Sequence, residues 1–168
     1  MSKSRIAFAL ALLFAAAAAQ AVEVAVPRPV PLSEDNEIAG NIKRECELGD
    51  KLAHYIAEFG RAGGQEVRFV ASDASPGDGR FLEVEIRDAM STGNAFVGHR
   101  KSVSVRGKLH DDGRVIGSFR ARRDSMGGAF GGYKGSCSVL GRTVKALGKD
   151  IVDWMAAPRM DADLGDLK

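Results

Sequence analysis

Apolar and polar residues alternate along the middle of the chain in four separate runs. These runs span residues 67–71, 82–86, 103–109 and 115–121. Alternation with a period of two puts one set of side chains on a buried face and the other in water, which is typical of antiparallel strands. Glycine-containing turn sequences separate the runs. The pattern therefore predicts a four-stranded antiparallel sheet.

Helical periodicity flanks these strands on both sides. From Asn41 to Phe59 apolar residues recur every three or four positions, and a second such stripe runs from Leu140 to Met155. Each predicted helix has one apolar stripe, and the predicted sheet has one apolar face. We therefore expect an α+β fold of two layers, with the order α-β-β-β-β-α and both helices packed on the same face of the sheet.

The remaining residues divide into a leader, an extended segment and a tail. Residues 1–21 combine a positive start, an apolar run and a small-x-small end, the three parts of a secretory signal peptide. Residues 22–40 contain several prolines and predict an extended segment, residues 41–158 a single domain, and residues 159–168 a flexible tail. We expect export to the periplasm or beyond, with cleavage near Ala21 and no transmembrane segment afterwards.

The formal net charge falls to zero once the predicted leader is removed. The chain has 24 Lys and Arg against 22 Asp and Glu, and a net charge of +2. Lys3 and Arg5 are the charged residues of the leader, so the exported part carries 22 of each sign. A nucleic-acid-binding domain normally has an excess of basic residues. We therefore expect no nucleic-acid partner.

The third and fourth strand-like runs allow a register to be predicted. Pairing Leu109 with Val115 keeps the apolar side chains on one face and leaves a three-residue loop at 111–113. The same register puts Gly107 opposite Gly117 on the inner face, where two missing side chains leave a gap. Either a helix packs closely there, or a small apolar cavity opens that could hold a ligand.

A glycine-rich stretch, GGAFGGYKGSCSVLG at 127–141, joins the last strand to the second helix. It matches neither the G-x-x-x-x-G-K-[ST] nor the G-x-G-x-x-G spacing of phosphate-binding loops. Backbone amides at the helix start, together with Lys134 and Ser136, could still hold an anion. The alternative is a mobile connection in which glycines relieve steric conflict.

The two cysteines, Cys46 and Cys137, are expected to form a disulfide in an oxidising compartment. Short connections would leave the two helices antiparallel and the cysteines at opposite ends, too far apart for a bridge. The twelve residues 124–135 can span about 40 Å when extended. We therefore interpret this stretch as a return crossing that makes the helices parallel and brings Cys137 to Cys46.

Residues suited to catalysis or metal binding are few. His54, His99 and His110 are scattered, and none has the spacing of a zinc site. No serine lies in G-x-S-x-G or heads S-x-x-K. We therefore expect no catalytic residues, no metal and no cofactor, and a protein that is not an enzyme.

Basic residues alternate on the outer face of the predicted hairpin at 103–121. They are Arg106, Lys108, Arg120 and Arg122. These residues predict a surface for an anionic partner such as lipid phosphate, an acidic glycan or an acidic protein. The alternative is a solvated sheet face on which Glu83 and Glu85 of the neighbouring strand pair with the cations.

Two segments, VSVRGKLHDDGRVIGSF and CSVLGRTVKALGKDIVDWM, with the glycine-rich crossing between them, resemble small uncharacterised envelope domains of Gram-negative bacteria. The resemblance covers roughly residues 80–157. It implies a terminal helix that packs back on the sheet and a link to envelope or surface-structure assembly. Relatives of this kind are often lipoproteins, and this chain departs from them because no cysteine follows its predicted leader.

These observations favour an exported periplasmic module for binding or envelope assembly, without catalytic activity. Its partner would be an envelope protein or an anionic envelope component. Two alternatives remain open. One is a secreted inhibitor of a hydrolase, and the other is a carrier of a small ligand in the gap at Gly107 and Gly117.

Overall fold

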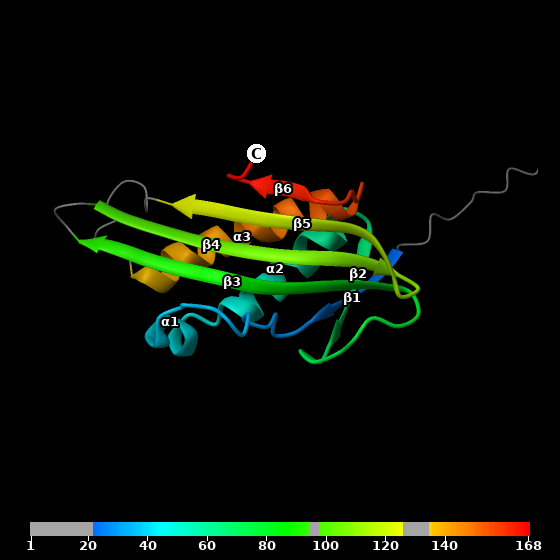
Figure 1. The fold of residues 1–168 in the computed structure, drawn as a ribbon, viewed down its shortest axis with the longest axis horizontal. Coiled ribbons are helices and arrows are strands. Elements are labelled where there is room, and N and C mark those ends of the chain that lie inside the picture. The colour runs from blue at the N-terminus through cyan, green and yellow to red at the C-terminus, as the bar shows by residue number, and fades with distance from the viewer. Residues whose placement is uncertain (1–21, 95–97, 126–134) are drawn as a thin grey trace, which may run out of the picture.

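The computed structural model of the chain describes residues 22–94, 98–125 and 135–168 (Figure 1). The predicted signal peptide at 1–21 and most of the glycine-rich stretch lie outside these residues. Within them the fold is α+β, with three helices and one six-stranded sheet. No helix in the described part of the chain is long and apolar enough to cross a membrane.

The elements follow one another as a strand, two helices, four strands, a helix and a last strand. The strands are β1 (Val22–Pro27), β2 (Gln65–Val70), β3 (Arg80–Asn94), β4 (Gly98–Asp111), β5 (Arg114–Ser125) and β6 (Ala162–Gly165). The helices are α1 (Gly40–Glu45), α2 (Leu48–Ala62) and α3 (Ser136–Met155). The order of strands across the sheet is β2-β1-β3-β4-β5-β6.

The sheet is mixed, which corrects the prediction of a purely antiparallel four-stranded sheet. β3, β4 and β5 form the expected antiparallel meander. β1, however, pairs in parallel with both β2 and β3, and β6 pairs in parallel with β5. β1 is six residues long and is followed by prolines, so in the sequence it reads as part of an extended segment. Its partners also lie far away along the chain, as parallel pairing requires.

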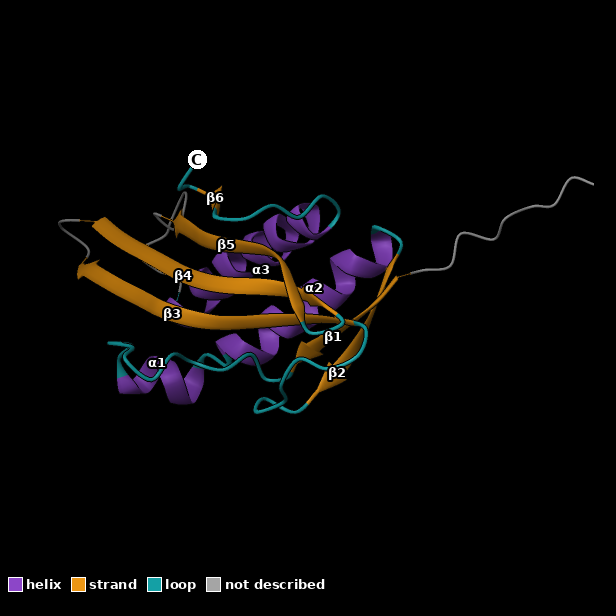
Figure 2. Ribbon diagram, turned by 45° about the vertical axis from the view of Figure 1, so that its right-hand side comes forward, coloured by secondary structure: helices purple, strands orange, loops and turns teal. Residues whose placement is uncertain are grey.

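Helices α2 and α3 cover one face of the sheet and run parallel to each other (Figures 1 and 2). At their starts a disulfide joins Cys46, just before α2, to Cys137 in the first turn of α3. Farther along, a Cβ at Gly148 would lie 2.8 Å from Cβ of Tyr55, so only glycine permits this close approach. The predicted disulfide and the predicted parallel arrangement of the helices are both present.

The single helix predicted over 41–59 is two helices in the structure. Glu47, between α1 and α2, adopts a left-handed backbone conformation with φ of 48°. The Lys51 ammonium donates a hydrogen bond of 2.6 Å to the Cys46 carbonyl at this break. Cys46 is fully buried. The break thus turns the cysteine toward the core, where it meets α3.

The register of β4 with β5 differs from the predicted one. Gly107 pairs with Phe119 and Gly117 pairs with Leu109, so the two glycines do not face each other. A β-bulge follows Leu109 and shifts the register. The loop consists of the two residues 112–113, both with positive φ, rather than the predicted three. Positive φ at both positions is what a two-residue type I′ hairpin turn requires.

Each of these two glycines accommodates an aromatic ring. A Cβ at Gly107 would lie 2.7 Å from Cε1 of Phe119, and one at Gly117 would lie 2.7 Å from Cζ2 of Trp154. The Phe119 and Trp154 rings contact each other, with centroids 4.8 Å apart. Gly107 and Gly117 are therefore close-packing positions, and the rings fill the space in which a ligand cavity was considered.

The tail predicted to be flexible at 159–168 contains β6 instead. Ala162 and Leu164 of this strand are each only 2% exposed. Asp163 pairs with Arg120 of β5 at 2.9 Å. The sequence shows only one repeat of apolar alternation here, which is too short to predict a strand. Burial against α3 and pairing with the edge of β5 stabilise it in the folded chain.

The segment between β1 and α1 is held against β3 by backbone hydrogen bonds and by an ion pair between Arg87 and Asp35. The Ser33 amide donates to the Ile86 carbonyl at 2.9 Å. The Arg87 guanidinium then binds both carboxylate oxygens of Asp35, at 2.7 and 2.9 Å. Hydrogen bonds from the Ser33 hydroxyl and from Arg87 lower the pKa of Asp35 to about 2.

We predict that the Asp35 carboxyl titrates near pH 2 when followed by NMR. Because its pKa is lowered in the folded state, the tether is complete above about pH 4 and is lost as the pH falls through 2. Ser33→Ala and Arg87→Gln should each raise the pKa toward 3.8. A wild-type midpoint already close to 3.8 would contradict the tether.

We predict that Gly117→Ala lowers the free energy of unfolding by about 1–3 kcal/mol, because the new methyl group would overlap the Trp154 ring. Urea unfolding measures this loss. Gly77→Ala is the matched control, since a Cβ at Gly77 meets nothing within 4 Å and the site is exposed. Its effect should stay within about 0.5 kcal/mol. Equal stability of the two variants would refute the close packing.

Candidate functional site

The sheet face opposite α2 and α3 carries an alternating set of charges, which we name the charged sheet face. Its members, in chain order, are Glu83, Glu85, Arg106, Lys108, Arg120, Arg122, Asp124 and Asp163. Pleating explains the arrangement, because Val84 and Val105 point into the core and their strand neighbours point away from it. The four basic residues predicted from the sequence therefore do lie on one surface.

Each of the four basic side chains has a carboxylate partner on its own strand or the next. The nitrogen–oxygen distances are 2.5 Å for Arg106–Glu85, 3.8 Å for Lys108–Glu83, 2.9 Å for Arg120–Asp163 and 3.1 Å for Arg122–Asp124. The hydrogen bond from Arg122 is the main cause of a lowered pKa at Asp124. The surface is therefore a mosaic of both signs. Exposed pairs of this kind add little stability, at most about 1 kcal/mol each.

A hollow of about 310 Å³ interrupts the charged sheet face. Val84 and Gly107, which are paired across β3 and β4, form its floor. The Glu83–Lys108 pair flanks it on one side and the Glu85–Arg106 pair on the other. Two carboxylates and two cations thus surround one depression, which suits a group that carries both donors and acceptors.

Glu83 has a second partner in His110, whose Nε2 lies 2.8 Å from its carboxylate. The His110 side chain is buried, and its ring contacts the Phe81 ring edge-on. The other ring nitrogen, Nδ1, is buried with no hydrogen-bond partner in the described part of the chain. Residues 22–94, 98–125 and 135–168 contain no group of three or more His, Cys, Asp or Glu that could hold a metal ion.

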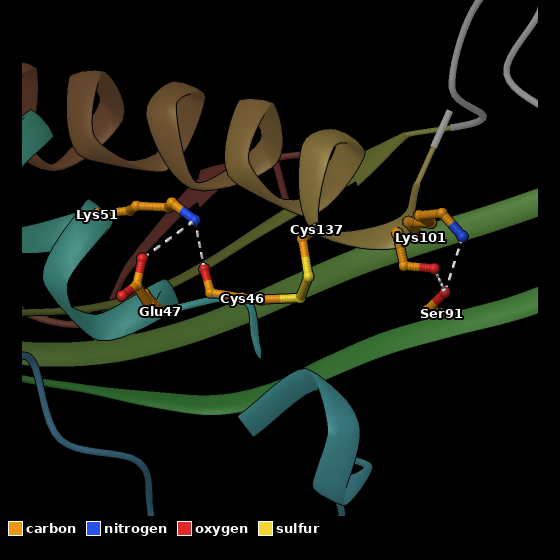
Figure 3. Close-up of a disulfide and its surroundings, with 7 residues drawn as sticks. Cys46, Glu47, Lys51, Ser91, Lys101 and Cys137 are labelled. Atoms are coloured by element: carbon orange, nitrogen blue, oxygen red, sulfur yellow. Dashed lines mark hydrogen bonds and ion pairs between the residues drawn. A yellow bond between two sulfur atoms is a disulfide. The ribbon is translucent and has the colours of Figure 1, made fainter. Parts of the chain in front are cut away.

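A different chemistry appears at the start of α3. Figure 3 shows the disulfide at the first turn of this helix, with Lys101 and Ser91 beside the same turn. The Lys101 ammonium donates to the Ser91 hydroxyl at 2.7 Å, and the Ser91 and Ser136 hydroxyls lie 3.0 Å apart. We name Ser91, Lys101 and Ser136 the α3-start cluster. Of the anion site predicted from the sequence, Ser136 belongs to this cluster, whereas Lys134 lies outside the described residues.

Lys101 could have been found in the sequence. It has the same odd numbering as Val103 and Val105, so the alternation that predicts the strand places Lys101 on the apolar face. The lysine is indeed buried, with 3% of its surface exposed. Ser91 could not have been found in this way. A bulge after Ile86 exchanges the inner and outer positions of β3 before Ser91 is reached.

An apolar groove of about 300 Å³ lies between the N-terminal segment and the first two helices. Its apolar lining residues are Pro29, Val30, Pro31, Leu32, Ile38, Ile42 and Leu48. Its position is unrelated to Gly107 and Gly117, where the sequence analysis had considered a ligand cavity.

Comparison with known proteins found similarity in structure but not in sequence. No protein-family model matches, and a search of curated proteins found no relative. A solved protein of the DUF330 family from Xanthomonas campestris has a TM-score of 0.54 and 14% sequence identity, over 80% of this chain and 83% of that one. This likeness is one of fold.

Two other solved structures are more distant. A lipoprotein from Neisseria meningitidis has a TM-score of 0.46 and 18% identity, over 80% of this chain and 98% of that one. A minor lipoprotein from Acinetobacter baumannii has a TM-score of 0.43 and 13% identity, over 80% and 92% of the respective chains. The similarity of fold to the DUF330 protein agrees with the resemblance to Gram-negative envelope domains seen in the sequence.

Proposed function

We propose that this protein is an exported module of the cell envelope that docks to a partner protein through the charged sheet face and carries out no covalent chemistry. The observation that carries the proposal is the hollow flanked by the Glu83–Lys108 and Glu85–Arg106 pairs. The predicted leader and the disulfide support export, since disulfides persist in oxidising compartments.

The pairing of the cations favours a protein over a lipid or a glycan as the partner. A polyanion is attracted by an excess of positive charge, and here the acidic and basic side chains compensate each other. A protein surface can present both signs in a matching arrangement, and such complementarity gives specificity and orientation. Because α2 and α3 cover the other face of the sheet, this face is the one that remains open to a partner.

The two alternatives from the sequence receive unequal support. A hydrolase inhibitor could act through the connection between β3 and β4, but residues 95–97 of this connection lie outside the described part of the chain. A small-ligand carrier cannot use the gap on the inner face at Gly107 and Gly117, because the rings of Phe119 and Trp154 fill that space. The apolar groove beside Ile42 is the place that such a carrier would use.

We predict that Arg106→Glu and the charge swap Glu85→Arg/Arg106→Glu both reduce capture of the partner about tenfold or more. The swap keeps the internal ion pair and the net charge but reverses the pattern that a partner meets. The protein would be expressed with its leader and a C-terminal tag in a Gram-negative host, crosslinked in intact cells and identified by mass spectrometry. Lys145→Glu, which makes the same charge change on exposed α3, is the control and should capture normally.

The two variants separate the possible partners. Reduced capture of the partner by both variants supports docking of a protein to the charged sheet face. Loss with Arg106→Glu alone, and normal capture by the swap, would show that only net charge matters and would favour an anionic lipid or glycan. Normal capture by both variants would refute the assignment of this face.

A further inference from the structure

Lys101 is a buried cation that has no carboxylate partner among the described residues. Its surface is 3% exposed, and within the described part of the chain it donates one hydrogen bond, to the neutral hydroxyl of Ser91. Its neighbours across the sheet on β3 and β5 are Ser91 and Ser125, which carry no charge. An ammonium group has three N–H donors. The bond to Ser91 uses one of them.

Arg123, an inward-facing cation on the neighbouring strand, has the carboxylate partners that Lys101 lacks among the described residues. Arg123 of β5 binds the Asp150 carboxylate of α3 with two hydrogen bonds of 2.7 Å, and it also contacts Asp166 at 2.9 Å. Asp150 is the main cause of the raised pKa of Arg123. Transfer of a charge from water to the interior is costly unless it is paired. Two carboxylates offset this cost for Arg123, whereas no carboxylate among the described residues lies within ion-pair distance of Lys101.

The serines next to Lys101 add further hydrogen-bond donors. Ser91 accepts a bond from Lys101 and shares one with Ser136 at 3.0 Å. These two contacts use two of the five N–H and O–H donors of the α3-start cluster, which leaves three. Ser91 and Ser136 are both partly exposed, so a small solute can reach the cluster from solvent.

The backbone of α3 adds to the same excess of donors. This helix of 20 residues has no side-chain cap and no acidic residue in its first turn. The amides of Ser138 and Val139 both bond to the Gly135 carbonyl. The first amides of a helix have no intrahelical acceptor, and those of Ser136 and Cys137 have no backbone acceptor among residues 22–94, 98–125 and 135–168. Anions are favoured at this end of a helix.

We propose that the α3-start cluster binds a phosphate group. A bound anion would neutralise Lys101 and accept the surplus hydrogen bonds from Ser136 and from the start of α3. Three side-chain donors and two amides exceed the roughly four acceptor positions on the two oxygens of a carboxylate, whereas the three terminal oxygens of a phosphate monoester offer about six such positions. This site lies on the helix side of the sheet and is independent of docking to the charged sheet face.

The test is an NMR titration of the exported, disulfide-bonded protein with inorganic phosphate and, separately, with acetate. Phosphate should cause saturable shifts of the Ser136 and Cys137 amides, and acetate should bind more weakly. Lys101→Met keeps the apolar stem and removes the charge, and it should weaken phosphate binding about tenfold or more. Lys145→Met removes an exposed lysine from α3, away from the α3-start cluster, and should leave phosphate binding unchanged.

Ser136→Ala provides an independent variant, because it removes one donor from an exposed helix start without changing the core. It should also weaken phosphate binding. Absence of saturable shifts in the wild-type protein would overturn the proposal. So would equal affinity of the wild-type and Lys101→Met proteins. Acetate binding as tight as phosphate binding would overturn the choice of phosphate.

Discussion

The covalent bond between Cys46 and Cys137 is the constraint on which the arrangement of the helices depends. It joins the break before α2 to the first turn of α3 across a separation of 91 residues. In the chain-entropy model, closing a loop of this length stabilises the folded state by about 4.6 kcal/mol. With their starts tied together, α2 and α3 run in the same direction, and Gly148 allows them to approach closely. The same bond holds the residue before Cys137, Ser136, over Ser91.

Basic side chains have different partners on the two faces of the sheet. On the outer face every member of the basic set has a carboxylate within reach, so the surface is neutral overall but finely patterned. On the inner face Arg123 is paired with Asp150, whereas the partner of Lys101 in the described part of the chain is a neutral hydroxyl. A patterned neutral surface suits recognition of another protein. A buried and uncompensated cation suits a small anion. The fold thus offers two kinds of binding at separate places.

Much of this fold follows from local sequence. The meander and the apolar stripe of α3 are visible as periodicity, and the disulfide followed from the compartment and the length of the glycine-rich crossing. β1 and β6 were not predicted because they are short and their pairing partners are distant in sequence. The register of β4 with β5 was wrong because a bulge after Leu109 cannot be read from alternation. Of the α3-start cluster, only Ser136 was predicted. The inward position of Lys101 follows from the strand alternation but was not predicted, and the bulge in β3 concealed Ser91.

Hydrogen–deuterium exchange of the disulfide-bonded protein and of a Cys46→Ala/Cys137→Ala variant tests the central role of the cross-link most directly. If the bond fixes the start of α3, the variant should lose amide protection in the first turns of α2 and α3, while β3, β4 and β5 keep theirs. Equal protection of the first turn of α3 in both proteins would show that packing alone holds the helix there, and would contradict this account.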